Sequence, residues 1–296
     1  MVNQLFLGDN PFIGVNHLSQ SRSRETSSMI TNERIEQILN TALDNGASGL
    51  LFSSNAVMRG FLKYLRDLGY SREFTMHMLI PDIQDLVRAS SEKGMAGLLT
   101  DFMGGLDTVG KIKAASGALL AGVTQDPERL LGNYIGAEIS RLQDLAPVHA
   151  RLQSIFLHEI ITELLVSFQL RDLVVRHIEH VRKRLNAPAG FATRNFARLT
   201  AFMSEEQIPI GDYVVLAPFN KAGFQMNPSR ESCEAALVHH PAMKVVVMNL
   251  LASGYCSVDE ALQYAKTLPA SISIVVGAST VEQARVTFSK LTELTK

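Results

Sequence analysis

The chain has 296 residues, of which 46% are hydrophobic and 19% are charged, so it can build one large α/β domain or two ordinary ones. Its formal net charge is −1 and its acidic and basic residues are mixed, which excludes the basic face that nucleic-acid binding requires. No apolar run approaches the roughly 20 residues of a membrane-spanning helix, and no export signal opens the sequence. Because the two cysteines, Cys233 and Cys256, have no metal-ligand spacing, we expect a reduced, cytoplasmic protein without nucleic-acid or membrane partners.

Short apolar runs alternate with amphipathic stretches along the chain, and these predict strands and helices in turn. A strand is expected from residue 4, and the next helix begins at Thr31 or Asn32 and ends at Gly46, with apolar residues at helical spacing. Further strands are expected to begin near residues 49, 74, 153, 189, 213, 244 and 271. Further helices are expected over 55–69, 169–186, 196–206, 231–238, 258–268 and 281–294.

The order of these elements predicts the fold class. Continuous apolar strands joined by helices indicate parallel pairing with both faces of the sheet covered. Eight such units fit a closed (β/α)8 TIM barrel, with residues 1–296 as a single domain. An open doubly wound sheet is the alternative, and the absence of a glycine-rich dinucleotide loop after the first strand disfavours it.

Residues 95–150 do not follow the rhythm of strand and helix. Their sequence predicts two or three helices and a strand over 118–123, which would be a ninth strand in the barrel. We therefore interpret 95–150 as a helical insertion after the third strand, serving as a lid or an oligomer contact. Its apolar character favours a homodimer.

Polar residues follow nearly every predicted strand. The loops at the carboxyl ends of the strands form the active-site mouth of a TIM barrel, so these side chains are expected to share one rim. One polar strand end is ordinary turn chemistry, whereas seven or eight together indicate a site for a small molecule. The residues are Asp9, Asn10 and His17; Ser53, Ser54 and Asn55; His77 and Asp82; His158 and Glu159; Thr193, Arg194 and Asn195; Asn220 and Lys221; Asn249; and Ser279 and Thr280.

Five segments, in this order along the chain, resemble the aldo-keto reductase superfamily. They are LFLGDNPFIG (5–14), ALDNGASGLLFSS (42–54), SIFLH (154–158), GFATRNF (190–196) and VVGASTVEQARVTFSKL (275–291). The resemblance implies a TIM barrel that binds NAD or NADP, with polar residues of 190–196 holding the nicotinamide amide. The last segment is implied to hold the cofactor phosphates, because a Gly-Ala-Ser turn before a helix offers free backbone N–H groups to an anion.

The catalytic tetrad of this family, Asp, Tyr, Lys and His, is incomplete in the chain. The four positions carry Ser53, Met58 or Arg59, His77 or Met78, and His158. Without the tyrosine there is no phenol to protonate a carbonyl oxygen as hydride arrives. The resemblance therefore implies the fold more strongly than it implies the reaction.

The interpretation that we favour is a divergent NAD(P)-linked oxidoreductase acting on a small carbonyl or alcohol. His158 would serve as the acid or base, oriented by Glu159 or Asp9, since imidazole titrates near neutrality. His77 and Asp9 are further catalytic candidates. The predicted cofactor contacts are Thr193, Asn195, Asn249, Ser253, Gly254, Gly277, Ala278, Ser279, Thr280 and Arg285. The predicted substrate contacts are Asn10, His17, Ser53, Asn55, Glu159, Arg194 and Asn220.

Three other interpretations stay open. A metal-assisted enzyme could use donor types that suit zinc, although no dense ligand motif is present; the candidates are Asp9, His17, His77, His158 and Glu159. A cofactor-free lyase or aldolase acting on a phosphorylated metabolite could use Lys221 as a Schiff-base nucleophile. A catalytically inactive barrel could keep only an anion pocket on the last two loops.

Several of these residues also have purely structural interpretations. Residues 277–280 could simply cap the last helix, and His77 could be a hydrogen-bonded histidine inside the barrel. The two cysteines are expected to be small core or loop residues. Surface positions on helices or helix ends are expected for His177, His180, His239 and His240.

Overall fold

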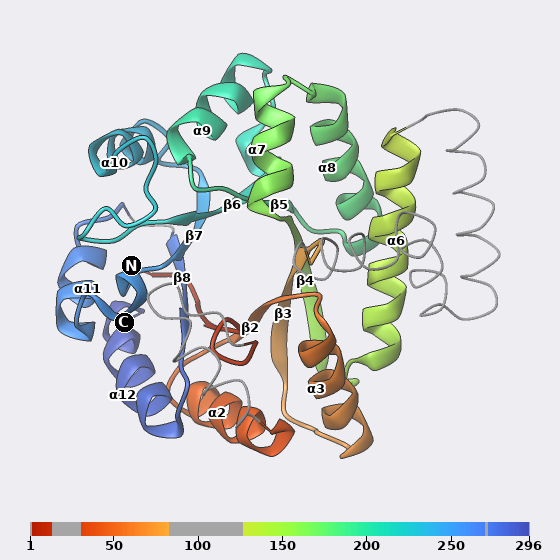
Figure 1. Ribbon diagram of the computed structural model, residues 1–296, viewed down its shortest axis with the longest axis vertical. Helices are drawn as coiled ribbons and strands as arrows, with labels where there is room; N and C mark the ends of the chain where they lie inside the picture. Colours follow the sequence, from red (N-terminus) through yellow and green to blue (C-terminus); the bar gives the residue numbers. More distant parts are fainter. Residues whose placement is uncertain (1, 14–30, 83–126, 270–271, 296) are drawn as a thin grey trace, which may run out of the picture.

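A closed barrel of eight parallel strands forms the centre of the protein, as the sequence predicts. The computed structural model describes residues 2–13, 31–82, 127–269 and 272–295 (Figure 1). The strands are β1 (Leu5–Gly8), β2 (Gly49–Ser53), β3 (Phe74–Ile80), β4 (Ala150–Leu157), β5 (Ala189–Ala192), β6 (Tyr213–Pro218), β7 (Lys244–Met248) and β8 (Ile272–Gly277). Phe6 of β1 lies opposite Gly49 of β2 on one side and Val275 of β8 on the other, which closes the ring.

Helices surround the barrel on its outer face (Figure 1). They are α2 (Asn32–Asp44), α3 (Ala56–Asp67), α6 (Pro127–Leu145), α7 (Glu159–Ser167), α8 (Arg171–Leu185), α9 (Phe196–Glu205), α10 (Arg230–His239), α11 (Val258–Ala265) and α12 (Val281–Leu291), with short 3₁₀ helices at Ile210–Asp212, Ala252–Gly254 and Thr292–Leu294. The predicted start of α2 is confirmed, since the Thr31 side chain accepts a hydrogen bond from the Arg34 backbone N–H. None of the described helices combines the length and the apolarity needed to cross a bilayer.

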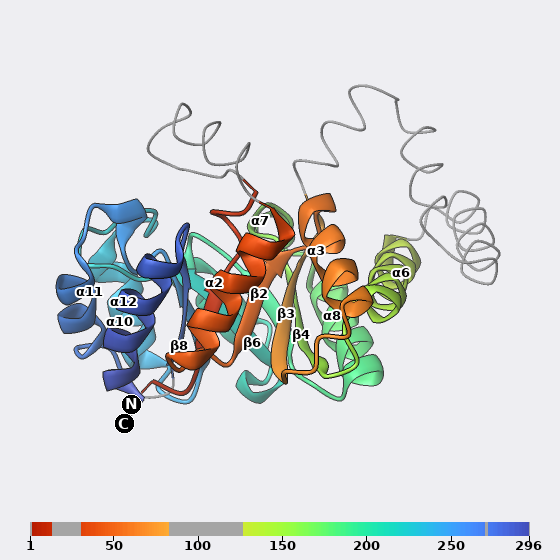
Figure 2. The ribbon, with the colours of Figure 1, turned by 90° about the horizontal axis from the view of Figure 1, so that it is seen from below.

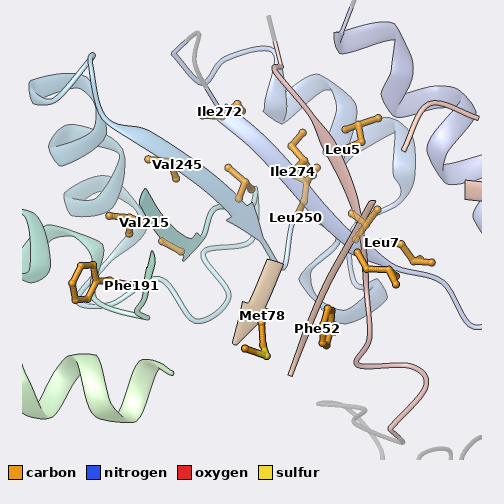
Figure 3. Packing of buried hydrophobic residues seen from close by; sticks show 14 of the residues in the cluster. Leu5, Leu7, Phe52, Met78, Phe191, Val215, Val245, Leu250, Ile272 and Ile274 are labelled. Atoms are coloured by element: carbon orange, nitrogen blue, oxygen red, sulfur yellow. The ribbon is translucent and has the colours of Figure 1, made fainter. Parts of the chain in front are cut away.

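Alternate strand residues face two separate cores. Leu5 and Leu7 of β1 join the large core between strands and helices, where they lie beside Ile274 of β8 (Figure 3). Phe6, between them in sequence, faces the barrel interior instead. The interior core consists of Phe6, Leu51, Phe156, Ala192, Leu216, Val246 and Val275. Side chains therefore fill the barrel centre, and the polar strand ends lie above this packed layer.

Helix α6 lies within the segment that the sequence predicts as an insertion. It packs against α3 on one side and α8 on the other, in the place of the regular barrel helix between β3 and β4 (Figure 1). Gly132 and Gly136 lie at this contact with α8, where an added Cβ atom would meet the His180 or the Arg184 side chain and that side chain would have to shift. The last part of 95–150 thus belongs to the barrel, while residues 83–126, including the predicted strand over 118–123, lie outside the described residues.

Two local predictions are wrong. The fourth strand ends at Leu157, and the residues after it form helix α7 instead of continuing the strand to residue 160. His177 is fully buried on α8 and not at the surface; its Nε2 lies 3.1 Å from the Gly190 carbonyl oxygen, and its ring meets Phe191 edge-on. The expectation for the two cysteines is confirmed, since both are buried.

Candidate functional site

The carboxyl ends of all eight strands lie on one face of the barrel. The backbone N–H of Val2, before β1, donates to the carbonyl oxygen of Leu294, after α12, at 2.9 Å. Both described chain ends therefore lie at the amino ends of the strands, and the polar strand ends lie on the opposite face (Figure 2). This face is the candidate active site.

Asp9 is a buried carboxyl group at the end of β1, with only 4% of its surface exposed. Its Oδ2 accepts hydrogen bonds from the Ser53 backbone N–H (2.8 Å) and from the Asn55 side-chain amide (3.2 Å). Burial raises the pKa of Asp9 to about 7, against these two donors, and the nearby Asp82 carboxylate acts in the same direction as burial. Three predicted residues, Asp9, Ser53 and Asn55, are thus brought together around an acid that titrates near neutral pH.

His77 lies inside the barrel, below the rim. Its Nδ1 is 2.7 Å from the Ser154 hydroxyl, and its ring centroid is 4.3 Å from that of Phe6. Its Nε2 is buried without a hydrogen-bond partner among the described residues. Burial lowers the pKa of His77 to about 4, so the ring is neutral at physiological pH. These contacts support the structural interpretation of His77 over the predicted catalytic role.

His158 sits between β4 and α7 as the N-cap residue of that helix. Its Nδ1 accepts a hydrogen bond from the Ile160 backbone N–H at 3.2 Å, so a neutral ring carries its proton on Nε2. Burial lowers the pKa of His158, and the Arg194 cation acts in the same direction, while the Glu159 and Asp82 carboxylates oppose it. The imidazole therefore offers a hydrogen-bond donor at the rim and carries no charge at neutral pH.

Arg194 and Glu159, two predicted substrate contacts, form an ion pair beside His158. The Arg194 side chain is 39% exposed and the Glu159 side chain is 16% exposed. Glu163 supports this pair from one turn further along α7, since its Oε1 accepts from the Arg194 backbone N–H at 2.9 Å. The spacing of Glu159 and Glu163, one helical turn apart, could have revealed Glu163, had residues 159–167 been predicted as a helix.

Thr193 and Asn195, the predicted nicotinamide contacts, have partners within the chain. The Thr193 hydroxyl donates to Glu163 at 3.3 Å and accepts from the Asn195 backbone N–H at 2.9 Å. The Asn195 side chain caps α9 by accepting from the Arg198 backbone N–H. These residues line a small hollow between α7 and α9, formed by Glu163, Val166, Ser167, Thr193, Asn195, Arg198 and Leu199.

The loops after β6 and β7 use their predicted site residues to hold their own shape. The buried Asn220 side chain bonds both the backbone N–H (2.8 Å) and the carbonyl oxygen (2.9 Å) of Phe224. Asn249 donates its side-chain N–H to Gln225 at 2.7 Å. Lys221 is exposed and pairs with Glu260, which raises the pKa of the lysine. A Schiff-base nucleophile needs a lowered pKa, so the structure argues against the aldolase role of Lys221.

The turn between β8 and α12 is a helix cap. Thr280 Oγ1 accepts from the Gln283 backbone N–H (3.1 Å), and Gln283 Oε1 accepts from the Ser279 backbone N–H (2.9 Å). Gln283 is exposed, so an anion can displace its side chain from Ser279. Gly277 must lack a side chain, because a Cβ atom there would lie 2.7 Å from Pro11. This turn fits a phosphate group.

The remaining predicted cofactor contacts are Ala278 and Arg285, in that turn and in α12, and Ser253 and Gly254, after β7. Ala278 is buried, and Arg285 is exposed in an ion pair with Glu282 at 2.6 Å. Ser253 and Gly254 belong to the short 3₁₀ helix after β7, where Ser253 has a left-handed backbone.

Two predicted substrate contacts and the possible metal ligands have not yet been placed. Asn10 is exposed in the turn after β1, and His17 lies outside the described residues. In the part of the chain that the structure describes, no three His, Cys, Asp or Glu side chains are grouped so that they could hold a metal ion.

A buried polar cluster behind the rim was missing from the predicted site. Glu138 of α6 is only 3% exposed, accepts a hydrogen bond from the Ser54 hydroxyl and pairs with Arg141 at 2.6 Å. Arg59 of α3 donates to the Ser54 carbonyl oxygen. The sequence offers no signal for this contact, because Ser54 and Glu138 are 84 residues apart.

The comparisons with known proteins support the fold. No protein-family model matches the chain, and no curated protein matches its sequence. Two solved structures of proteins from Pseudomonas aeruginosa, provisionally described as aldo-keto reductases, match 100% of this chain with a TM-score of 0.55 each. Their sequence identities are 12% and 11%, and the match covers 91% and 92% of their own chains. The described part of the chain therefore shares its barrel fold with these proteins.

Proposed function

We propose that the chain is an enzyme that reduces a small carbonyl compound, or oxidises the corresponding alcohol, at the carboxyl end of the barrel. The observation that carries this proposal is the Asp9 carboxyl group, whose pKa burial raises to about 7 at the end of β1. An acid of that strength can give up and regain a proton at neutral pH. The full-length likeness to two provisional aldo-keto reductases supports carbonyl chemistry on this barrel.

In the proposed reaction, His158 would polarise the substrate carbonyl group and Asp9 would donate the proton. The neutral His158 ring would donate a hydrogen bond from Nε2 to the substrate oxygen and polarise the carbonyl group. Asp9 would supply the proton that this oxygen gains when the carbonyl carbon accepts a hydride. The resulting Asp9 carboxylate would be stabilised by the Ser53 N–H and the Asn55 amide, and water would return the proton. We therefore propose Asp9 as the acid in place of His158, because a neutral imidazole is a poor proton donor.

NAD or NADP would supply the hydride when bound. The residues that fit its phosphates are the Ser279 backbone N–H, once Gln283 moves aside, and the Arg285 guanidinium. Gly277 leaves room beside Pro11 for a close approach to the backbone.

A second candidate function, that of a lyase, is favoured by one observation at the residues after β5. Thr193 and Asn195, which the resemblance assigns to the nicotinamide amide, already bond Glu163 and the first turn of α9. A lyase that moves a proton between Asp9 and a phosphorylated substrate would need neither residue. Both candidates use the same acid and the same phosphate turn.

Thermal unfolding of the full chain with NADPH, NADH, inorganic phosphate or zinc separates the two candidates. A ligand held at about 100 times its Kd stabilises a protein by about 2.7 kcal/mol, which raises Tm by several degrees. We expect NADPH or NADH to raise Tm well beyond an equal concentration of phosphate. An equal response to nucleotide and phosphate would support the lyase, and no response to either nucleotide would overturn the oxidoreductase proposal.

A further inference from the structure

A buried ion pair holds the loop between β2 and α3 from behind. Glu138 and Arg141 of α6 lie one helical turn apart with side chains that are 4% and 16% exposed. Glu138 also accepts a hydrogen bond from the Ser54 hydroxyl, and Arg59 of α3 donates to the Ser54 carbonyl oxygen. Two outer helices thus fix a single loop residue through its side chain and its backbone.

The two neighbours of Ser54 in sequence are the donors to Asp9. The Ser53 backbone N–H lies 2.8 Å from Asp9 Oδ2, and the Asn55 side-chain amide lies 3.2 Å from the same oxygen. Asn55 is held again by capping α3, where its Oδ1 accepts from the Met58 backbone N–H. A shift of Ser54 would therefore move both donors relative to the Asp9 carboxyl group.

Holding a loop with a buried ion pair carries a large desolvation free energy. Removing two charges from water costs several kcal/mol per ion, and well-packed apolar residues of similar volume often stabilise a protein as well or better. Fixing one specific arrangement is a role that buried ion pairs have in some proteins. The donors that meet Asp9 are what this arrangement fixes.

We propose that Glu138, paired with Arg141, is a positioning residue that holds Ser54 and thereby keeps the Ser53 and Asn55 donors on the Asp9 carboxyl group. This inference rests on the proposed function of Asp9 as the acid of the site. It adds a residue on the outer ring of helices that touches no substrate and acts through the β2–α3 loop.

The charges around the two groups determine how the test must be designed. Asp82, at the end of β3, is the carboxylate that acts on Asp9. Arg141 pairs with Glu138. Burial raises the pKa of the half-buried Tyr134 of the same helix, on which the Glu138, Arg141 and Arg59 charges also act. Removing Glu138 alone would take one carboxylate partner from the mostly buried Arg141 and change the charge of the cluster, so the test removes both charges together.

The experiment is a titration of the Asp9 carboxyl carbon by NMR in the full chain, with the signal assigned by Asp9→Asn. Two charge-neutral changes are compared with the parent: Ser54→Ala, and Glu138→Met combined with Arg141→Met. Each should raise the pKa of Asp9 by about half a unit to one unit, because the carboxylate loses well-aligned donors. Ser54→Ala added to the double variant should raise it no further, since both act through one contact.

The control is Glu179→Met combined with Arg176→Met, a pair at the same spacing that is exposed on α8 and should leave the pKa of Asp9 unchanged. An unchanged pKa in both test variants, with a parent pKa near 7, would overturn the positioning role and leave the proposed function standing. A parent pKa near 4 would instead contradict the proposed acid itself. A purely structural role of Glu138 would lower the unfolding midpoint without moving the Asp9 titration.

Discussion

At the residue scale, Asp9 shows two opposing effects whose balance determines its chemistry. Two donors stabilise its ionised form, while almost complete burial destabilises that form by removing water. The effect of burial is larger than that of the two hydrogen bonds, and the pKa of Asp9 rises to about 7. A carboxyl group in this state can act as an acid where the resemblance leaves no tyrosine.

The first prediction concerns this proton. Asp9→Asn keeps the size of the side chain and removes its acid, so we expect turnover of a carbonyl substrate to fall by about 10²- to 10⁴-fold. Substrate affinity should change little, because the amide still fits the space and can still accept from Ser53. Steady-state kinetics with a panel of small aldehydes and ketones measures both quantities. A variant that keeps its kcat would contradict the acid role.

The buried histidines predict the behaviour of the protein in acid. Burial lowers the pKa of both His77 and His177 to about 4, whereas an unfolded histidine titrates near 6.5. Between these values the unfolded chain binds more protons, so stability is complete above pH 6.5 and is lost as the pH falls towards 4. His77→Gln keeps a partner for Ser154 and does not titrate. The free energy of unfolding of this variant should therefore fall less steeply than that of the parent over this range, with a difference in slope of up to about 1.4 kcal/mol per pH unit.

Urea unfolding of the parent and of His77→Gln at a series of pH values measures this difference. His149→Gln changes an exposed histidine and serves as the control. Parallel pH profiles for the parent and His77→Gln would show that His77 is not the buried neutral group described above.

Only part of the arrangement of the candidate site could be predicted from the sequence, for a physical reason. The order of strand ends around a barrel follows from chain order, so Asp9, Ser53 and Asn55 could be predicted to lie on one rim. Whether a rim side chain faces a ligand or caps a helix depends on contacts that no local pattern encodes. Asn195 and Asn220 therefore turned out to hold their own loops.

At the element scale, β2 and β3 approach each other so closely that one position must be glycine. A Cβ atom on Gly49 would lie 2.0 Å from the Thr75 carbonyl oxygen, which belongs to the backbone and cannot move aside. Gly60 on α3 has open space around it, with no heavy atom within 4 Å of an added Cβ. The two positions form a matched pair for substitution.

We predict that Gly49→Ala destabilises the protein by at least about 2 kcal/mol, by forcing the two strands apart. Gly60→Ala should be neutral or should stabilise it by up to about 1 kcal/mol, because alanine is the better helix former. Chemical denaturation of both variants measures the difference. Similar unfolding midpoints would contradict the described pairing of β2 with β3.

Helix α7 depends on His158 for its first turn, so the cap and the proposed catalytic role must be separated. His158→Asn keeps a side chain that can cap the helix, whereas His158→Ala removes the cap and should cost about 1 kcal/mol. Both variants lose the imidazole donor and should lose turnover alike. Equal unfolding midpoints for the two variants would show that the Nδ1 cap contributes nothing.

The two features that were predicted wrongly from the sequence, the end of β4 and the position of His177, both depend on contacts between elements. Apolar residues stand on both sides of His158 and Glu159 in residues 152–160, and such a short run does not distinguish a continuous strand from a strand that ends where a helix begins. His177 lies among charged residues on α8, and only the packing of that helix against β5 shows that it points inward.

At the scale of the whole molecule, the fold was the most predictable feature. Each of the eight units repeats the same local signal, and parallel strands with both faces covered close into a ring once eight of them are present. The exact register could not be predicted, because it is fixed by interior packing such as that of Phe156, whose ring leaves room at Gly190 only for a hydrogen. Helix α6 was assigned to an insertion because residues 95–150 are too long for one unit.

The proposed chemistry depends on one group, the buried Asp9 carboxyl at the carboxyl face of the barrel, whose pKa burial raises to about 7. Titration of the Asp9 carboxyl carbon in the unmodified chain tests it most directly, since no substrate has to be known. We predict an apparent pKa of about 7. A value near 4, the ordinary range of an aspartate, would contradict the account.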